Sequence, residues 1–226
     1  MIAALFDCDG TLYSGVFGRG LMRYASEHGR AGQVRVYYLS LLWPYLLRNL
    51  KILPEEKFQP QLMTGLAALL TGMTEAEGRA LFEWLLHEYL LPTQRSDVIA
   101  RLRQHQAQGH MVVLVSAQFL PCLELLGQHL QVAGVIGTRL EVEARRYTGR
   151  ILPPLITGPA KDTCTRELFA ARALEIEWGA SYAYADSITD QKLLGMVGQA
   201  VAVYPDAKLH ALAQAKGWEM IGTPKA

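Results

Sequence analysis

The sequence predicts an α/β fold, with a doubly wound parallel sheet and a helical subdomain inserted near its start. Continuous apolar runs of strand length recur along the chain, and segments of helical periodicity separate them. Strands that alternate with helices are typical of parallel sheets whose two faces are both buried. The chain has 226 residues, 50% of them hydrophobic, which is enough for the core of one domain with an insertion.

The first strand is predicted at residues 2–6, because the run IAALF is continuously apolar and a turn signal closes it. The next residues read DCDGT, which places Asp7 and Asp9 one residue apart and just before Gly10. Two carboxylates this close repel each other, and burial increases the cost. We therefore expect a cation or a chemical role to keep them at the end of this strand.

The segment after this motif predicts a helical insertion. No buried strand is apparent from residue 13 to residue 95, a stretch too long for a structureless loop in a compact domain. Its clearest helix begins with the capping box TEAE at Thr74. We predict that residues 14–94 form a cap over the ligand site, and that residues 1–13 and 95–226 form the catalytic core.

One apolar segment of the insertion has two interpretations. Residues 36–47 carry no charge, and Arg35, Arg48 and Lys51 flank them. The run is too short to span a bilayer. We expect it to pack within the cap, or between two caps in a homodimer. The second interpretation is that residues 35–51 line an apolar specificity pocket or contact a membrane surface through the apolar run, with the basic residues meeting lipid phosphates.

The second half of the chain supplies the remaining elements of the core. Apolar runs rich in β-branched residues or alanine predict further strands, and N-cap and glycine signals delimit helices between them. The predicted strands are 111–115, one ending at Asp186 and one ending near Tyr204; the predicted helices are 97–108, with Ser96 as N-cap, 120–130 and 161–174; a hairpin is predicted at 139–151.

Polar residues follow three of the predicted strands directly: Asp7, Ser116 and Asp186. In open α/β sheets, ligands bind outside the carboxyl ends of the strands. Lys161, in the first turn of its predicted helix, can reach the same crevice. The sequence therefore predicts one site made of residues that are far apart along the chain.

These residue types suit phosphoryl transfer. A carboxylate can attack phosphorus and form an aspartyl-phosphate, and we expect Asp7 to be this nucleophile. Asp9 would protonate the leaving oxygen and later deprotonate the attacking water. Ser116, with Ala117 after it, and Lys161 would hold the phosphate oxygens.

The reaction brings a carboxylate to a phosphate dianion, so we expect a hard divalent cation at the site. Mg²⁺ prefers carboxylates, waters and substrate phosphate oxygens. The expected ligands are the carboxylates of Asp7 and Asp186 and the backbone carbonyl of Asp9. Asp190 would bind the metal directly or through a water.

Composition limits the partners. A formal net charge of +1 gives no overall field that would attract nucleic acid, so we expect none to bind. Three cysteines at no metal-like spacing, with no signal-peptide pattern before the first strand, indicate a cytoplasmic protein.

Taken together, the motifs resemble the haloacid dehalogenase superfamily. DCDGT, the serine of VLVSAQ, the lysine of GPAKD and the two aspartates of ADSITD occur in the order of its four motifs. The chain resembles subfamily IB, which contains phosphoserine phosphatase, in the length of the insertion and in the segment VIGTRLEVE followed by YTGRILPP. The resemblance covers essentially the whole chain and implies a Rossmann-like core, a helical cap and Mg²⁺-dependent phosphomonoester hydrolysis through Asp7. The chain departs from phosphoserine phosphatases at Ala117 and Gln118, where those enzymes usually carry two glycines, and at ADS in place of glycine-aspartate-glycine.

We therefore predict a phosphatase whose substrate is a small phosphorylated metabolite, such as phosphoserine or a related amino-acid or alcohol phosphate. A lipid-phosphate phosphatase that uses the apolar cap segment is the main competing hypothesis. The same residues are also compatible with a phosphotransferase or mutase, with a dehalogenase, and with a catalytically silent binding module. The sequence is compatible with a monomer or a homodimer.

Overall fold

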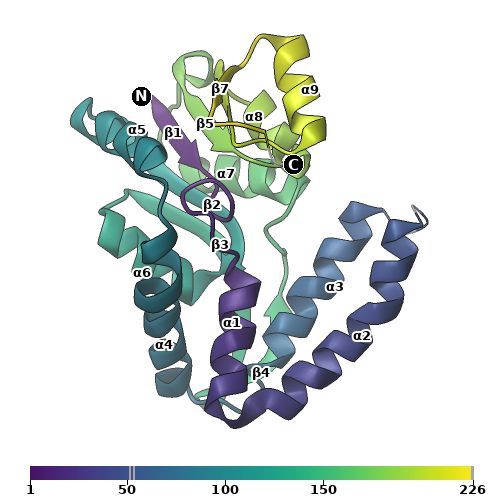
Figure 1. Ribbon diagram of the computed structural model, residues 1–226. Coiled ribbons are helices and arrows are strands. Elements are labelled where there is room, and N and C mark those ends of the chain that lie inside the picture. The colour runs from purple at the N-terminus through teal and green to yellow at the C-terminus, as the bar shows by residue number, and fades with distance from the viewer. Residues whose placement is uncertain (51, 53, 225–226) are drawn as a thin grey trace.

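A seven-stranded sheet forms the centre of the molecule in the computed structural model, which describes residues 1–50, 52 and 54–224 (Figure 1). The described strands lie in the order β4-β3-β2-β1-β5-β6-β7, and every neighbouring pair is parallel except β3 and β4. The predicted doubly wound α/β fold is therefore confirmed. The strands are β1 (Ala3–Phe6), β2 (Met111–Phe119), β3 (Gly134–Glu143), β4 (Arg146–Leu152), β5 (Tyr182–Ala185), β6 (Gln199–Val203) and β7 (Glu219–Ile221).

Helices cover both faces of this sheet. They are α1 (Phe17–Ala25), α2 (Ala31–Asn49), α3 (Glu55–Ala68), α4 (Glu75–Trp84), α5 (Ser96–Ala107), α6 (Leu120–Leu130), α7 (Pro159–Ala171), α8 (Gln191–Gly195) and α9 (Ala207–Lys216). Leu102 of α5 and Leu123 of α6 belong to the core on one face, whereas Phe169 of α7 and Leu209 of α9 belong to the core on the other.

The first strand shows why the apolar run is continuous. Side chains of a strand alternate between the two faces of the sheet. Ala4 and Phe6 pack into one core, and Ala3 and Leu5 pack into the other, and all four are fully buried. A strand covered on both faces has no position for a polar residue until it ends, which is where Asp7 follows.

Most predicted elements of the core are present in the structure, but several bounds differ: β2 continues to Phe119, and α7 spans Pro159–Ala171 instead of 161–174. Helix α6 has the predicted bounds, and α5 begins at Ser96 itself, with Arg95 as its N-cap. The predicted hairpin at 139–151 is present as β3 and β4, but β3 starts earlier and first pairs in parallel with β2. Strand β7 was not predicted, because it has only three residues and none of them is buried.

The described residues between β1 and α5 form helices and contribute no strand to the sheet. The predicted capping box is present: the Thr74 hydroxyl accepts from the backbone N–H of Glu77, and the Glu77 carboxylate accepts from the backbone N–H of Thr74. Figure 1 shows α2 and α3 side by side, on the far side of α1 from α4 and α6. Lys51 lies outside the described residues, as do residue 53 of the predicted cap and residues 225–226 of the predicted core. The boundaries of cap and core stay a prediction.

Helix α2 buries only one side. Val34 and Tyr37 are buried, and Tyr37 donates a hydrogen bond to the backbone carbonyl of Leu62 in α3 at 3.2 Å. The opposite side, called here the outer face of α2, exposes large apolar side chains, each by 46–66%. The outer face comprises Val36, Tyr38, Leu39, Leu42, Trp43, Tyr45 and Leu46. The expectation that the apolar run packs within the cap is therefore wrong for this side of the helix.

Helix α2 is apolar but does not meet the requirements of a membrane span. Among the described residues, no helix combines the length and the hydropathy needed to cross a bilayer.

A buried histidine links α5 to the sheet. His105 is 4% exposed, and its ring nitrogens lie 2.8 Å from the Tyr184 hydroxyl and 2.8 Å from Nδ1 of His110. Burial, with smaller effects of the nearby His110 and Arg101 charges, lowers the pKa of His105 to about 4. The folded protein therefore holds His105 neutral at pH values where an unfolded chain would protonate it.

This arrangement predicts acid-sensitive stability. As the pH falls from 7 to 5, the unfolded chain binds a proton that the folded protein cannot bind, so the free energy of unfolding should fall by about 1–2 kcal/mol through His105. We expect His105→Phe to be less stable at pH 7 but to lose less stability on acidification. Urea unfolding of both proteins at pH 7, 6 and 5 measures the difference, and parallel pH profiles would contradict this interpretation.

Candidate active site

The candidate site lies where the direction of the sheet connections reverses. From β1 the chain continues to β2 and β3 on one side, whereas β5, β6 and β7 follow on the other side of β1. Such a switch point leaves a crevice at the carboxyl ends of the two central strands. Asp7 follows β1 and Asp186 follows β5, so the pairing of these strands places both aspartates at the crevice.

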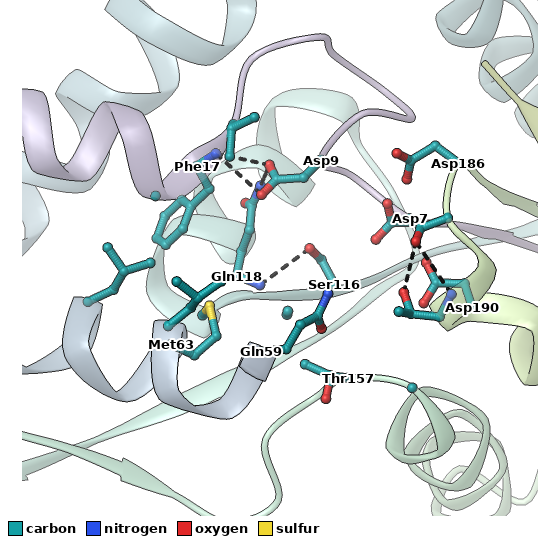
Figure 2. Close-up of a pocket in the computed structure, with 18 of the residues that line it drawn as sticks. Asp7, Asp9, Phe17, Gln59, Met63, Ser116, Gln118, Thr157, Asp186 and Asp190 are labelled. Carbon is teal, nitrogen blue, oxygen red and sulfur yellow. Dashed lines mark hydrogen bonds between the residues drawn. The ribbon is translucent and has the colours of Figure 1, made fainter. Parts of the chain in front are cut away.

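The structure brings four of the predicted residues close together. Carboxylate oxygens of Asp7, Asp186 and Asp190 lie within 4.8 Å of one another, and we call these three residues the acid cluster. Lys161 Nζ donates to Asp7 Oδ1 at 2.6 Å and to Asp190 Oδ2 at 2.8 Å. Figure 2 shows the acid cluster together at one end of the pocket. Because all four side chains are buried, water cannot screen their charges.

The acid cluster carries more negative charge than its lysine can balance. Burial alone would lower the pKa of Lys161, but the carboxylates of Asp190 and Asp7 outweigh it and raise that pKa above its usual value. Burial and the charge of Asp7 raise the pKa of Asp190 to about 7, although Lys161 opposes this shift. Three buried carboxylates beside one ammonium group thus favour one further positive charge. Oxygen ligands at this spacing fit a hard divalent cation.

Asp9 lies outside the acid cluster. Its carboxylate accepts hydrogen bonds from the backbone N–H of Phe17 at 3.2 Å and from Nε2 of Gln118 at 2.7 Å. The turn at Gly10, whose φ of 80° is in the region that favours glycine, follows Asp9 directly. Burial, then the charge of Asp7, raises the pKa of Asp9 to about 7. A carboxyl group with this pKa can both donate and accept a proton near neutral pH.

Ser116 is at the site but not at the end of its strand. Strand β2 continues to Phe119, with an irregular register against β3 between Val115 and Phe119. Ser116 and Ala117 line the same cavity as Asp7 and Lys161, and Thr157 of the loop before α7 joins them. The cavity has a volume of about 360 Å³.

The structure also reveals site residues that the sequence analysis did not assign. The Thr11 hydroxyl lies 3.1 Å from Asp7 Oδ2 and 3.3 Å from Asp186 Oδ1, and so links the two aspartates. Asp206 accepts from the Ser187 hydroxyl and the Ile188 backbone N–H, which fixes the loop after Asp186. Thr11 belongs to the quoted DCDGT motif, whereas nothing near Asp206 in the sequence pointed to the site.

Gln118 is a further unassigned residue. It is 1% exposed and donates from Nε2 to both Asp9 and the Tyr13 hydroxyl, while its Oε1 has no hydrogen-bond partner among the described residues. Figure 2 shows Gln118 between Phe17 and Ser116. It therefore connects the Asp9 carboxylate to β2.

The far end of the cavity is mainly apolar. Apolar residues of α1 and α3 line the cavity, and Figure 2 shows two of them, Phe17 and Met63, at the opposite end from Asp186 and Asp190; the apolar residues are Phe17, Met22, Leu62, Met63 and Leu66. The helical insertion and the sheet thus enclose one cavity with a charged end and an apolar end.

Comparisons with known proteins agree with this geometry. A family model of haloacid dehalogenase-like hydrolases matches residues 4–195. The chain is 30% identical over 224 residues to phosphoserine phosphatase SerB1 of Mycobacterium tuberculosis strain H37Rv, an alignment that covers 96% of this chain and 70% of that protein.

Solved structures show the same fold. A crystal structure of a protein of unknown function from Bordetella pertussis Tohama I superimposes with a TM-score of 0.84 and 27% identity over 97% of each chain. A phosphoserine phosphatase holding an analogue of its phospho-aspartyl intermediate superimposes with a TM-score of 0.66 and 16% identity, over 99% of this chain and 93% of that one. The family model spans β1 through α8 and includes every member of the acid cluster, so this chain belongs to the haloacid dehalogenase-like hydrolases.

Proposed function

We propose that this chain is a Mg²⁺-dependent phosphomonoester hydrolase that acts through an aspartyl-phosphate on Asp7. The observation that carries the proposal is the environment of Asp7: a buried carboxylate at the switch point, 2.6 Å from Lys161 Nζ and within the acid cluster. The phosphatases among the relatives support this reaction class.

The reaction has two steps in this proposal. An oxygen of Asp7 attacks phosphorus, the bond from phosphorus to the substrate oxygen breaks, and Asp9 gives its proton to that oxygen. Asp9 then takes a proton from a water, whose oxygen attacks phosphorus and releases inorganic phosphate with Asp7 restored. Lys161 holds the Asp7 carboxylate in position and, with Ser116 and Ala117, binds the phosphate oxygens.

The acid cluster fits the predicted metal. Asp7, Asp186 and Asp190 would hold Mg²⁺, with the backbone carbonyl of Asp9 as a further ligand, and the ion would neutralise charge between the nucleophile and the phosphate. The Thr11 hydroxyl orients Asp7 and Asp186, and Asp206 fixes the loop that follows Asp186.

The helical insertion acts as a cap in this proposal, because α1 and α3 supply the apolar end of the cavity. The substrate is a phosphomonoester. The relative named phosphoserine phosphatase supports a small amino-acid phosphate, whereas the apolar residues that line the cavity support a lipid phosphate, the competing hypothesis. A phosphotransferase or mutase would use the same Asp7 chemistry with an acceptor other than water. A cytoplasmic location suits the free thiols of Cys8, Cys122 and Cys164.

The first prediction of this function concerns the nucleophile. Asp7→Asn should abolish phosphate release from every substrate that the wild type hydrolyses, because an amide does not attack phosphorus. The measurement is phosphate release from a panel of amino-acid, sugar, nucleotide and lipid phosphates. Full activity in this variant would disprove the assignment, and absence of turnover in the wild type would favour a binding module.

The second prediction separates the roles of the two N-terminal aspartates. Asp9→Asn should slow hydrolysis of alkyl phosphates by about 10²–10⁴, because their alkoxide leaving groups need a proton. Hydrolysis of para-nitrophenyl phosphate should slow much less, since nitrophenolate leaves without one. An equal loss on both substrates would exclude Asp9 as the acid.

The third prediction concerns the metal. Mg²⁺ should raise the unfolding temperature of the wild type, because the ion relieves repulsion within the acid cluster. In Asp186→Asn the shift should be much smaller, whereas in the control Asp162→Asn, at an exposed ion pair on α7, it should match the wild type. EDTA should abolish turnover and added Mg²⁺ restore it; equal thermal shifts in all three proteins would place the metal elsewhere.

A further inference from the structure

We propose that the substrate of this site is the phosphomonoester of a lipid, and that the enzyme takes it at an anionic bilayer surface contacted by the outer face of α2. The proposal rests on the proposed function and specifies the substrate class. Two separate features carry it: the polarity of the cavity and the surface of α2.

The cavity offers carboxylates at one end only. Among the described residues that line it, the carboxylates are those of the acid cluster and Asp9, and all of them have roles in the proposed reaction. Beyond that end, Arg19 is the one charged residue among the described lining residues, and the other side chains are apolar apart from the glutamines and the Tyr37 hydroxyl. The ammonium group of phosphoserine would find no carboxylate there, and burying an unpaired charge is costly. An apolar leaving group fits better.

The volume of the cavity implies that a long substrate extends beyond it. At about 360 Å³, the cavity is near the lower limit for a ligand pocket. It can hold a phosphate and the nearest part of an alcohol, so the remainder of an acyl chain must lie outside. Tyr37 of α2 and Leu62 of α3 line the cavity on the side of these two helices. The acyl chain would leave the cavity beside α2.

Between residues 36 and 47, helix α2 is apolar on nearly every side, with Ser40 as the one side chain outside the apolar and aromatic types. With 3.6 residues per turn, Leu39, Trp43 and Leu46 follow one line along the helix, and Tyr38, Leu42 and Tyr45 follow the neighbouring line. All six are at least 46% exposed. A helix that is apolar all round is normally covered on every side. The outer face therefore needs a partner with a broad apolar surface.

Charge and aromatic content favour a lipid partner. From residue 28 to residue 54, the sequence contains four Lys or Arg residues and no Asp or Glu. Arg35 lies exposed on α2, beside Tyr38 and Leu39 of the outer face. Cationic segments with exposed Trp and Tyr are typical of helices that lie in the interface of anionic membranes.

A second copy of the chain is the competing partner. Leu39, Trp43 and Leu46 have the spacing of residues that pack between two paired helices. Such a contact is narrow, however, and would leave the neighbouring line of Tyr38, Leu42 and Tyr45 exposed. A dimer would also not explain why the cavity lined by the same helix is apolar. A bilayer accounts for both features, since it covers the wide outer face and supplies an amphiphile with a phosphate head.

The first part of the test is vesicle flotation. The wild type should float with vesicles of phosphatidylcholine containing phosphatidylglycerol, and less with phosphatidylcholine alone. Leu39→Asp/Trp43→Asp should weaken binding by about tenfold or more. The control Val142→Asp/Met220→Asp, which changes exposed apolar residues on β3 and β7, should bind like the wild type. Equal flotation of both double variants, or none by the wild type, would overturn the proposal.

The second part is turnover. The wild type should hydrolyse a monoacylglycerol phosphate presented in these vesicles with a higher kcat/KM than O-phosphoserine. The α2 double variant should lose about tenfold on the lipid and remain unchanged on para-nitrophenyl phosphate, which also verifies its fold. A preference for O-phosphoserine, or equal loss on lipid and aryl phosphate, would overturn the proposal.

Two controls separate this proposal from its rivals. Asp7→Asn should float like the wild type and hydrolyse nothing, so failure of the proposed function is distinguishable from failure of the lipid proposal. Light scattering measures the mass in solution. A wild-type dimer that becomes a monomer in the α2 double variant would assign the outer face to a second copy and overturn the proposal.

Discussion

The contact of Lys161 with Asp7 and Asp190 is the interaction on which the candidate site depends. Three buried carboxylates converge at the carboxyl end of the sheet, and without a positive charge among them their repulsion would oppose folding. The lysine reaches both partners from the first turn of α7, at 2.6 and 2.8 Å. Its ammonium leaves the acid cluster with excess negative charge. Lys161 therefore reduces the repulsion among the three carboxylates, and the negative charge that remains favours the binding of a cation.

Strand pairing in the sheet brings together residues that are far apart in the sequence. Asp7 and Asp186 are separated by most of the chain, yet β1 and β5 pair directly, and the backbone N–H of Asp7 donates to the carbonyl of Tyr184 at 2.9 Å. Because both strands are buried on both faces, a register shift would move large apolar side chains. The positions of the two aspartates are thus fixed by the same packing that stabilises the core.

The sequence predicted those parts of the molecule where burial dictates residue type. Buried strands read as apolar runs, so the residues that follow them, such as Asp7 and Asp186, could be assigned to one site. It did not predict Gln118 or Asp206, because a glutamine in a strand or an aspartate before a helix occurs for many reasons and only tertiary contacts reveal its role. For the outer face of α2, only the expectation of packing within the cap was wrong, because an apolar run indicates that something covers it but not whether that partner is part of the chain.

The two ends of the cavity have different roles in the proposed reaction: the charged end would bind and cleave the phosphate, and the apolar end would bind the leaving group. Residues of β2 and α7, and of the loops that follow β1 and β5, surround the charged end, whereas α1 and α3 supply Phe17 and Met63 at the other. Since Asp9 accepts a hydrogen bond from the backbone N–H of Phe17, at the start of α1, the position of the insertion is coupled to the proposed acid. In the proposed mechanism, a substrate that packs against Phe17 would therefore contact the residue whose backbone N–H binds the carboxylate of Asp9, the proposed proton donor. In the proposed mechanism, the backbone hydrogen bond from Phe17 would thus link the binding of an apolar leaving group to the protonation of its oxygen by Asp9.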